Sequence, residues 1–150
     1  MKILLAVDGS AQSDEAVAEV ARRPWPKGSV IRVLSAVENV PLGLVGLPVT
    51  YFKELTDSIK SHAQTAVDAA LEKLIKTFGD SVEVYGDAIN GSPKQVIVDE
   101  ANTWGADLIV VGAYGHGSLE RFVLGSVPQA VVHHADCSVE IVRSRGPAKQ

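Results

Sequence analysis

The sequence has little cysteine, no long apolar run and no excess of positive charge, and each shortage excludes a class of protein. Its single cysteine, Cys137, excludes an intrachain disulfide framework and is typical of a reducing cytoplasm. No apolar stretch approaches the roughly 20 residues of a membrane span. The N-terminal apolar run ends at Asp8, too short for the core of a signal peptide. A net charge of -4 argues against nucleic acid as a general partner.

Familiar catalytic and cofactor motifs are also missing. No Gly-Lys-Ser/Thr occurs, which excludes a Walker A loop. The dinucleotide fingerprint is expected at the first strand–helix turn, where Gly9 stands alone. No serine lies in a Gly-x-Ser-x-Gly turn, so a hydrolase triad lacks support. The histidines show no metal-ligand spacing, and Cys137 is typical of a small buried side chain rather than a nucleophile.

Apolar runs of strand length alternate with segments of helical periodicity along the 150 residues. We expect strands at 3–7, 30–37, 82–89, 107–113 and 139–142, and helices from about 13 to 23, 51–78, 93–104 and 126–134. Ser92 is the expected cap of the third helix, and Gly79 the expected stop of the second. This alternation predicts an α/β fold: a single domain over 1–145 with an open parallel five-stranded sheet, helices on both faces, and a polar tail over 146–150.

A glycine-rich run follows the fourth predicted strand and is the most informative segment. It contains Gly112, Gly115 and Gly117, with Gly125-Ser126 further on. Glycines let the backbone turn its N–H groups toward a ligand, and the next helix adds the positive end of its dipole. A phosphate suits such a site. The candidate donors are the amides of Gly115, His116, Gly117, Ser118, Ser126 and Val127 and the Ser126 hydroxyl. The alternative is an ordinary glycine-rich connection.

Two other strand ends converge on the same edge of the predicted sheet. Asp8 follows the first strand, where it could accept hydrogen bonds from ribose or help hold a metal on phosphates; the alternative is an ordinary turn aspartate. Backbone groups at Val37 could meet an adenine edge, although any strand end could do the same. Ligands of open α/β sheets bind beyond such strand ends.

These residues resemble the universal stress protein family. The similarity lies in Gly112-x2-Gly115-x9-Gly125-Ser126 and in Val7-Asp8-Gly9-Ser10, and it extends through Gly105–Gly112, Gly91-Ser92-Pro93 and His134–Cys137. It covers the whole chain, and the spaced glycines are fairly specific to the family's ATP-binding branch.

The resemblance implies the strand order 3-2-1-4-5 and ATP, or AMP or ADP, bound across the crevice, with Mg or Mn on the phosphates. Asp8 would lie near the ribose, and Val37 or a neighbour near adenine. The residues expected to bind the nucleotide are Ala6, Val7, Asp8, Val37, Gly112, Gly115, His116, Gly117, Ser118, Gly125, Ser126 and Val127. No direct metal ligand and no catalytic residue are expected.

The resemblance also implies a homodimer formed by the last strands, Val139, Glu140, Ile141 and Val142. We therefore expect a cytoplasmic ATP-binding stress-response protein, a nucleotide-dependent sensor or switch with an unknown protein partner and at most slow ATP hydrolysis. One alternative is an ATP-dependent nucleotidyl or phosphoryl transferase, which would need a catalytic constellation that is not visible. Another is a nucleotide-free dimeric interaction module.

Three features depart from the family or from ordinary composition. Glu140 places a charge on the expected dimer strand, where it would alter or weaken pairing. Pro128 removes an N–H near the phosphates. The loop from Val40 to Val49 is unusually apolar, which favours a segment that folds over the nucleotide, contacts a partner or packs on its own domain.

Overall fold

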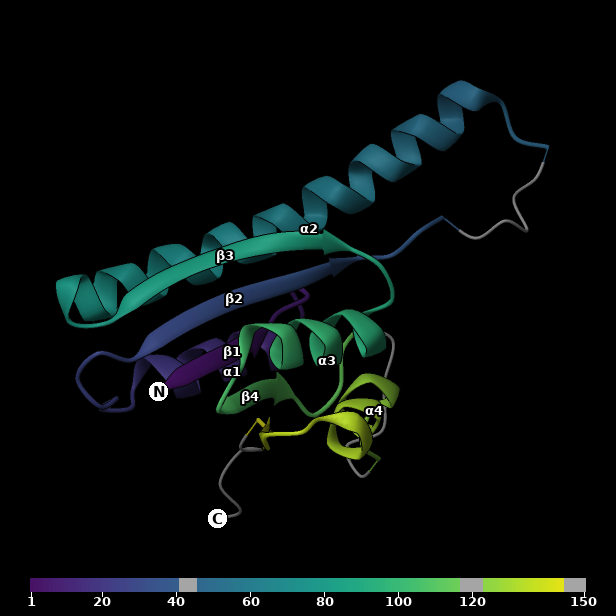
Figure 1. Cartoon of the computed structure of the whole chain (residues 1–150). Helices are drawn as coiled ribbons and strands as arrows, with labels where there is room; N and C mark the ends of the chain where they lie inside the picture. The colour runs from purple at the N-terminus through teal and green to yellow at the C-terminus, as the bar shows by residue number, and fades with distance from the viewer. Residues whose placement is uncertain (41–45, 117–122, 145–150) are drawn as a thin grey trace, which may run out of the picture.

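Five parallel strands form one sheet in the order β3-β2-β1-β4-β5. The structure, a computed structural model, describes residues 1–40, 46–116 and 123–144 (Figure 1). The strands are β1 (Lys2–Ala6), β2 (Val30–Val37), β3 (Glu83–Asn90), β4 (Leu108–Gly112) and β5 (Ser138–Val142). The α/β prediction and the strand order implied by the resemblance are confirmed.

Helices cover both faces of the sheet, because alternate residues of each buried strand point to opposite sides. The helices are α1 (Ala11–Ala21), α2 (Val49–Phe78), α3 (Pro93–Trp104) and α4 (Ser126–His134), with the short 3-10 turn η2 (Gly79–Ser81) after α2. Ile3 and Leu5 of β1 pack with α1 and α2. Leu4 and Ala6 pack with α3 and α4. The central strand is therefore buried on both sides, and its C-terminal end opens directly onto the site.

Local chemistry sets the ends of the helices. Ser10 caps α1, its hydroxyl accepting the N–H of Ser13 at 3.3 Å, so this helix starts slightly before its expected beginning. Gly79 and Gly105 end α2 and α3 with positive φ angles of 53° and 73°, which glycine adopts at little cost. Ser92 stands at the cap position of α3, but its side chain makes no capping hydrogen bond, so the predicted cap is positional only.

The long helix α2 packs on the sheet mainly through its C-terminal half. Its buried residues are Ala63, Val67, Ala70 and Leu74. The N-terminal turns run beyond the ends of the strands (Figure 1), and Tyr51 and Phe52 are exposed there. Of the expected apolar loop, Val40 is buried and Leu47 exposed, while 41–45 lie outside the described residues. Within the described ranges, no helix is long and apolar enough to cross a membrane.

Candidate functional site

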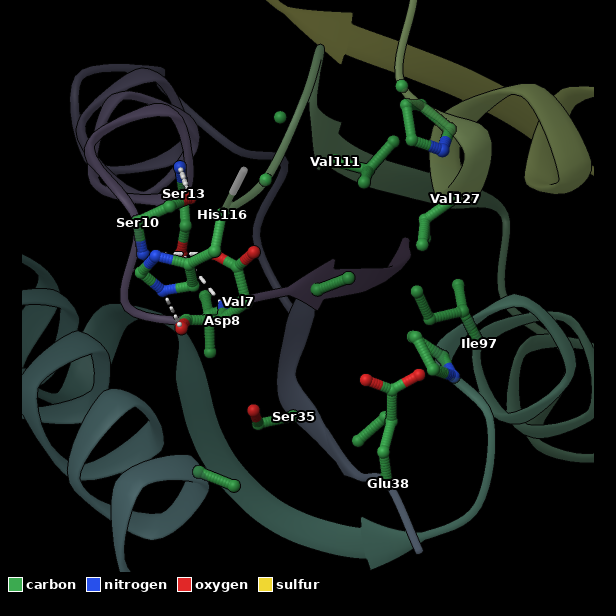
Figure 2. A pocket seen from close by; sticks show the side chains of 18 of the residues that line it. Val7, Asp8, Ser10, Ser13, Ser35, Glu38, Ile97, Val111, His116 and Val127 are labelled. Atoms are coloured by element: carbon green, nitrogen blue, oxygen red, sulfur yellow. Dashed lines mark hydrogen bonds between the residues drawn. The ribbon is translucent and has the colours of Figure 1, made fainter. Parts of the chain in front are cut away.

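A cavity of about 840 Å³ opens at the C-terminal ends of β1, β2 and β4. Its lining comes from these strand ends, from α2, α3 and α4, and from the glycine-rich loop after β4. Figure 2 shows Asp8 and His116 on one side and Glu38 and Ile97 on the other, with Ser35 between them. This volume lies within the range of about 300–1,000 Å³ that small-molecule sites occupy.

Asp8 is held in place by a tight turn between β1 and α1. Its carboxylate Oδ1 accepts the N–H of Ser10 at 2.9 Å, and its own N–H donates to Ser13 Oγ at 3.2 Å (Figure 2). The other oxygen, Oδ2, lies beside Gly115: a Cβ on Gly115 would stand only 2.5 Å from it. A side chain at residue 115 would therefore displace the carboxylate.

Two further glycines allow the backbone to pack closely beside the cavity. A Cβ on Gly112 would meet the backbone of Gln12 at 3.0 Å, and one on Gly125 would meet the Cα of Tyr114 at the same distance. The N–H of Gly125 donates to the carbonyl of Ala113 at 2.8 Å. This bond joins the two ends of the glycine-rich loop, so that the end of β4 and the start of α4 face the same space.

The N-terminus of α4 supplies donors to the cavity. Gly125 is its N-cap, and Ser126 and Val127, its first two residues, line the cavity. Amides in the first turn of a helix have no intrahelical acceptor, and the helix dipole adds partial positive charge. Pro128, at the third position, also lines the cavity and has no N–H to give. The arrangement suits an anion that takes two amide donors from α4.

The comparisons with known proteins agree with the fold. Residues 1–143 match the model of the universal stress protein family. The chain belongs to this family. It is 32% identical to universal stress protein MJ0531 of Methanocaldococcus jannaschii, over 95% of this chain and 81% of that protein.

Solved structures have the same architecture. Universal stress protein UspA from Lactobacillus plantarum matches with a TM-score of 0.80 at 28% identity, over 95% of this chain and 97% of that one. The universal stress protein from Archaeoglobus fulgidus, solved in complex with dAMP, matches with a TM-score of 0.68 at 22% identity, over 95% and 97%. At that identity the second likeness speaks for the fold alone.

Most of the predicted site residues of this universal stress protein line the one cavity: Ala6, Val7, Asp8, Gly112, Gly115, His116, Gly125, Ser126 and Val127. Gly117 and Ser118 lie outside the described residues. Val37 is buried and does not line the cavity, and its carbonyl accepts the N–H of Gly91 at 2.9 Å. Its neighbours Ala36 and Glu38 line the cavity instead, and a backbone contact to adenine at Val37 or a neighbour stays a prediction.

Sequence reasoning missed several polar residues of the cavity: Ser10, Ser13, Ser35, Glu38, Ser58 and His62. Ser10 and Ser13 could have been found from their place beside Asp8. His62 carried a weaker signal, since it stands one helical turn before Ala66 on the inner side of α2. Only the packing of α2 against the first turn brings its ring to the cavity.

The other candidates stay outside the site. Within the described ranges, no group of three or more His, Cys, Asp or Glu side chains could hold a metal ion. His133 and His134 end α4, with His134 Nδ1 2.8 Å from the carbonyl of Ala130. Cys137 is partly buried and packs on the core that Leu4 and Ala6 form with α3 and α4, and burial raises the pKa of its thiol. A raised pKa disfavours the thiolate that a nucleophile needs.

Proposed function

We propose that this universal stress protein binds ATP in the cavity and works as a nucleotide-dependent sensor or switch of the stress response. The observation that carries the proposal is the meeting of Asp8, Gly115 and the first amides of α4 in one cavity. An acceptor for hydroxyls, a close backbone approach and a helix N-terminus are what a nucleotide's ribose and phosphates require. The dAMP complex of the Archaeoglobus fulgidus protein supports the same class of ligand.

In the proposed complex, each part of the nucleotide meets a different wall. The apolar side chains of Ile97 and Val111 and the backbone near Ala36 would enclose the base. The Asp8 carboxylate would accept hydrogen bonds from ribose hydroxyls. The phosphates would take the amides of Ser126 and Val127, the Ser126 hydroxyl and the glycine loop, with Pro128 reducing the donors available to a triphosphate.

The residues present fit a divalent metal carried mainly by the phosphates. Hard cations such as Mg²⁺ and Mn²⁺ prefer oxygen ligands, and Asp8 could offer one carboxylate. Among the described lining residues, Asp8 and Glu38 are the carboxylates. A metal would neutralise phosphate charge. We expect hydrolysis to be slow because the Asp8 carboxylate, which accepts the N–H of Ser10, would face the ribose rather than an attacking water.

For switching, the nucleotide must bind two conformations of the protein with different affinity. We propose a cytoplasmic homodimer as the working form, with a protein partner that reads the nucleotide-bound state. The signal would then be the fraction of the protein that holds a nucleotide, and not the rate at which the nucleotide is hydrolysed.

The direct test is mass spectrometry of small molecules released from the purified protein, followed by calorimetric titration with ATP, AMP and GTP and an assay for released phosphate. We expect a copurified adenine nucleotide, or a titration in which ATP binds more tightly than GTP, with turnover far slower than dissociation. An empty protein that binds none of the three would overturn the proposal. Rapid, acceptor-dependent turnover would favour the transferase alternative.

A further inference from the structure

The strand β2 divides the cavity into two sides, because its alternate residues point to opposite faces of the sheet. Val33 packs in the core with α1 and α2, and Leu34 packs in the core with α3 and α4. Ser35 therefore faces α2, while Ala36 faces α3, and both line the cavity. The ribbon of β2 passes between Ser35 and Ile97 (Figure 2). The proposed nucleotide places its base on the side of Ile97, which leaves the other side without a ligand.

The space on that other side exists because α2 leaves the sheet toward its N-terminus (Figure 1). Farther from the cavity, a Cβ on Gly86 would meet the carbonyl of Val33 at 2.6 Å and Val67 Cγ1 at 3.0 Å, so the helix lies directly on the strands. One and two helical turns before Val67, Ala63 and Ile59 line the cavity instead. We call this space the α2 lobe; its lining residues are Ser35 from β2 and Ser58, Ile59, His62 and Ala63 from α2.

Ser35 carries the observation that points to a ligand in the α2 lobe. The residue is 3% exposed, and its hydroxyl makes no hydrogen bond with another residue in the described part of the chain. Buried hydroxyls ordinarily have a partner, because an unpaired one costs free energy. Ser29, just before β2, is the ordinary case: it is 1% exposed and donates to the carbonyl of Pro26 at 2.6 Å. The Ser35 hydroxyl points into the cavity (Figure 2), so its partner has to come from there.

The lining of the α2 lobe defines the class of molecule that would fit. Ile59 and Ala63 offer apolar contacts, and the hydroxyl of Ser35 can both donate and accept a hydrogen bond. The described residues that line the cavity include no lysine or arginine, while Asp8 and Glu38 carry negative charge, so an anion would be repelled. A charge buried without a partner would also cost free energy. The lobe therefore suits an uncharged molecule with an apolar body and one polar group.

We infer that the α2 lobe is a second ligand site, which binds a small uncharged molecule with an apolar body and an amide or hydroxyl group. The inference rests on the proposed function and extends it: the protein would sense this molecule together with the nucleotide. Because the base and the second molecule would lie on opposite sides of β2, both can be bound at once.

The test uses benzamide as the probe and benzoate as its charged counterpart of the same shape. Backbone amide resonances of the full chain are followed by NMR during titration, with and without saturating ATP. We expect benzamide to shift the amides of Ser35, Ile59 and Ala63 with a dissociation constant of about 1 mM, a value typical of a small fragment. The constant should be the same with ATP bound, and benzoate should bind at least about tenfold more weakly.

Two matched serine variants separate binding from stability. Ser35→Ala should weaken benzamide binding about fivefold through the lost hydrogen bond, leave ATP affinity within about twofold, and not lower the melting temperature. Ser29→Ala makes the same change at a buried serine that has a partner, so it should lower the melting temperature by about 2–4 °C and keep the affinity for benzamide. Ala63→Leu should fill the lobe and prevent benzamide binding while ATP still binds.

The outcomes distinguish the two proposals. If ATP binds but benzamide shifts none of the three amides, or if ATP displaces benzamide completely, the second site is overturned and the proposed function stands. Equal binding of benzoate, or an unchanged affinity for benzamide in Ser35→Ala, would also overturn the inference. Benzamide binding in a protein that binds no nucleotide would overturn the proposed function alone, and a protein that binds neither would overturn both.

Discussion

Gly115 is the residue at which a substitution should most clearly lower the affinity for ATP without changing the free energy of unfolding. Because Gly115 has no Cβ, there is room for Asp8 Oδ2, which would be 2.5 Å from a Cβ at this residue. Gly115→Ala should therefore push the carboxylate aside and weaken ATP binding by about tenfold or more, as expected for a lost charge-assisted hydrogen bond. The residue is exposed, so we expect the free energy of unfolding to change by less than about 0.5 kcal/mol. Calorimetry and urea unfolding measure the two effects.

The matched control is Gly105→Ala, at the C-cap of α3. Gly105 has φ 73° and ψ 49°, and a Cβ there would meet open space. Alanine in this left-handed conformation costs about 1–2 kcal/mol, while the cavity is untouched. Gly115→Ala should thus lose ATP affinity with little change in stability, and Gly105→Ala should lose stability with little change in affinity. Equal losses of affinity, or a large loss of stability in Gly115→Ala alone, would contradict the role given to Gly115.

Residues in short local motifs could be predicted from the sequence more readily than residues whose contacts join distant parts of the chain. Asp8 was placed in the site from its position after a strand, because parallel strand ends share one edge. The contact between His62 and His116 joins positions more than fifty residues apart, and no periodicity encodes it. The contact to adenine expected at Val37 or a neighbour stays a prediction: the carbonyl of Val37 accepts the N–H of Gly91, while Ala36 and Glu38 line the cavity.

At the scale of elements, an ion network joins α1 to the edge strand β5. The two terminal guanidinium nitrogens of Arg23, Nη1 and Nη2, donate to Glu140 at 2.5 and 2.7 Å, and Nη2 also donates to Glu19 at 2.7 Å. The hydrogen bond to Glu140 is the main cause that raises the pKa of Arg23. The charge of Glu140 on β5 is thus compensated within the chain by Arg23.

The network also makes stability depend on pH. Burial raises the pKa of Glu19, but hydrogen bonds from Arg23 and Arg22 outweigh it and leave the pKa below its ordinary value. Such a carboxyl stabilises the fold above its unfolded pKa and loses this contribution as the pH falls through the folded pKa. We expect Arg23→Ala to cost about 0.5–1 kcal/mol at pH 7, a loss that shrinks below about pH 4.

Urea unfolding of the wild type, Arg23→Ala and Arg22→Ala at pH 7 and pH 3.5 tests this pH dependence of stability. Among the described residues, Arg22 pairs with Glu19 but not with Glu140, and it is more exposed than Arg23, so its variant should lose less stability. A deficit in Arg23→Ala that is the same at pH 7 and pH 3.5 would mean that packing, and not charge, links α1 to β5.

Element types and most boundaries could be read from the sequence, because strong caps and breakers mark them. Gly79 and Gly105 end their helices as glycine at a positive φ should. The early start of α1 was less visible, since Gln12 and Ser13 are buried polar residues in its first turn. Gln12 exchanges hydrogen bonds with Ser144, a partner 132 positions away, and this pairing explains its burial.

At the scale of the whole molecule, the sheet has two edges, and their chemistry differs. β3 carries Glu83 and Asp87, and charged side chains on an edge discourage pairing with another chain. β5 carries Val139 and Ile141, while its one charge, Glu140, is bound by Arg23. The fold therefore favours β5 as the edge through which two copies would pair by a two-fold axis, as the proposed homodimer requires.

The direction of the backbone groups makes the dimer testable. The carbonyl of Val142 accepts the N–H of Ala113, the residue after β4, so the alternating residues Val139 and Ile141 turn their N–H groups to the free edge. On the other edge, the carbonyl of Val37 accepts the N–H of Gly91, which places the N–H of Ala88 outward on β3. Val139→Pro would remove one edge donor in each copy, and Ala88→Pro is its counterpart on the opposite edge.

Sedimentation velocity over a range of protein concentrations compares the three proteins. We expect a dimeric wild type, a dimeric Ala88→Pro, and a dissociation constant raised about 100-fold or more in Val139→Pro, because each copy leaves an acceptor of its partner without a donor. Proline is tolerated on an edge strand whose N–H faces outward, so both variants should fold, which circular dichroism checks. A dimer that survives Val139→Pro but is lost in Ala88→Pro would move the interface to β3, and a monomeric wild type would mean that nucleotide occupancy is read from a single subunit.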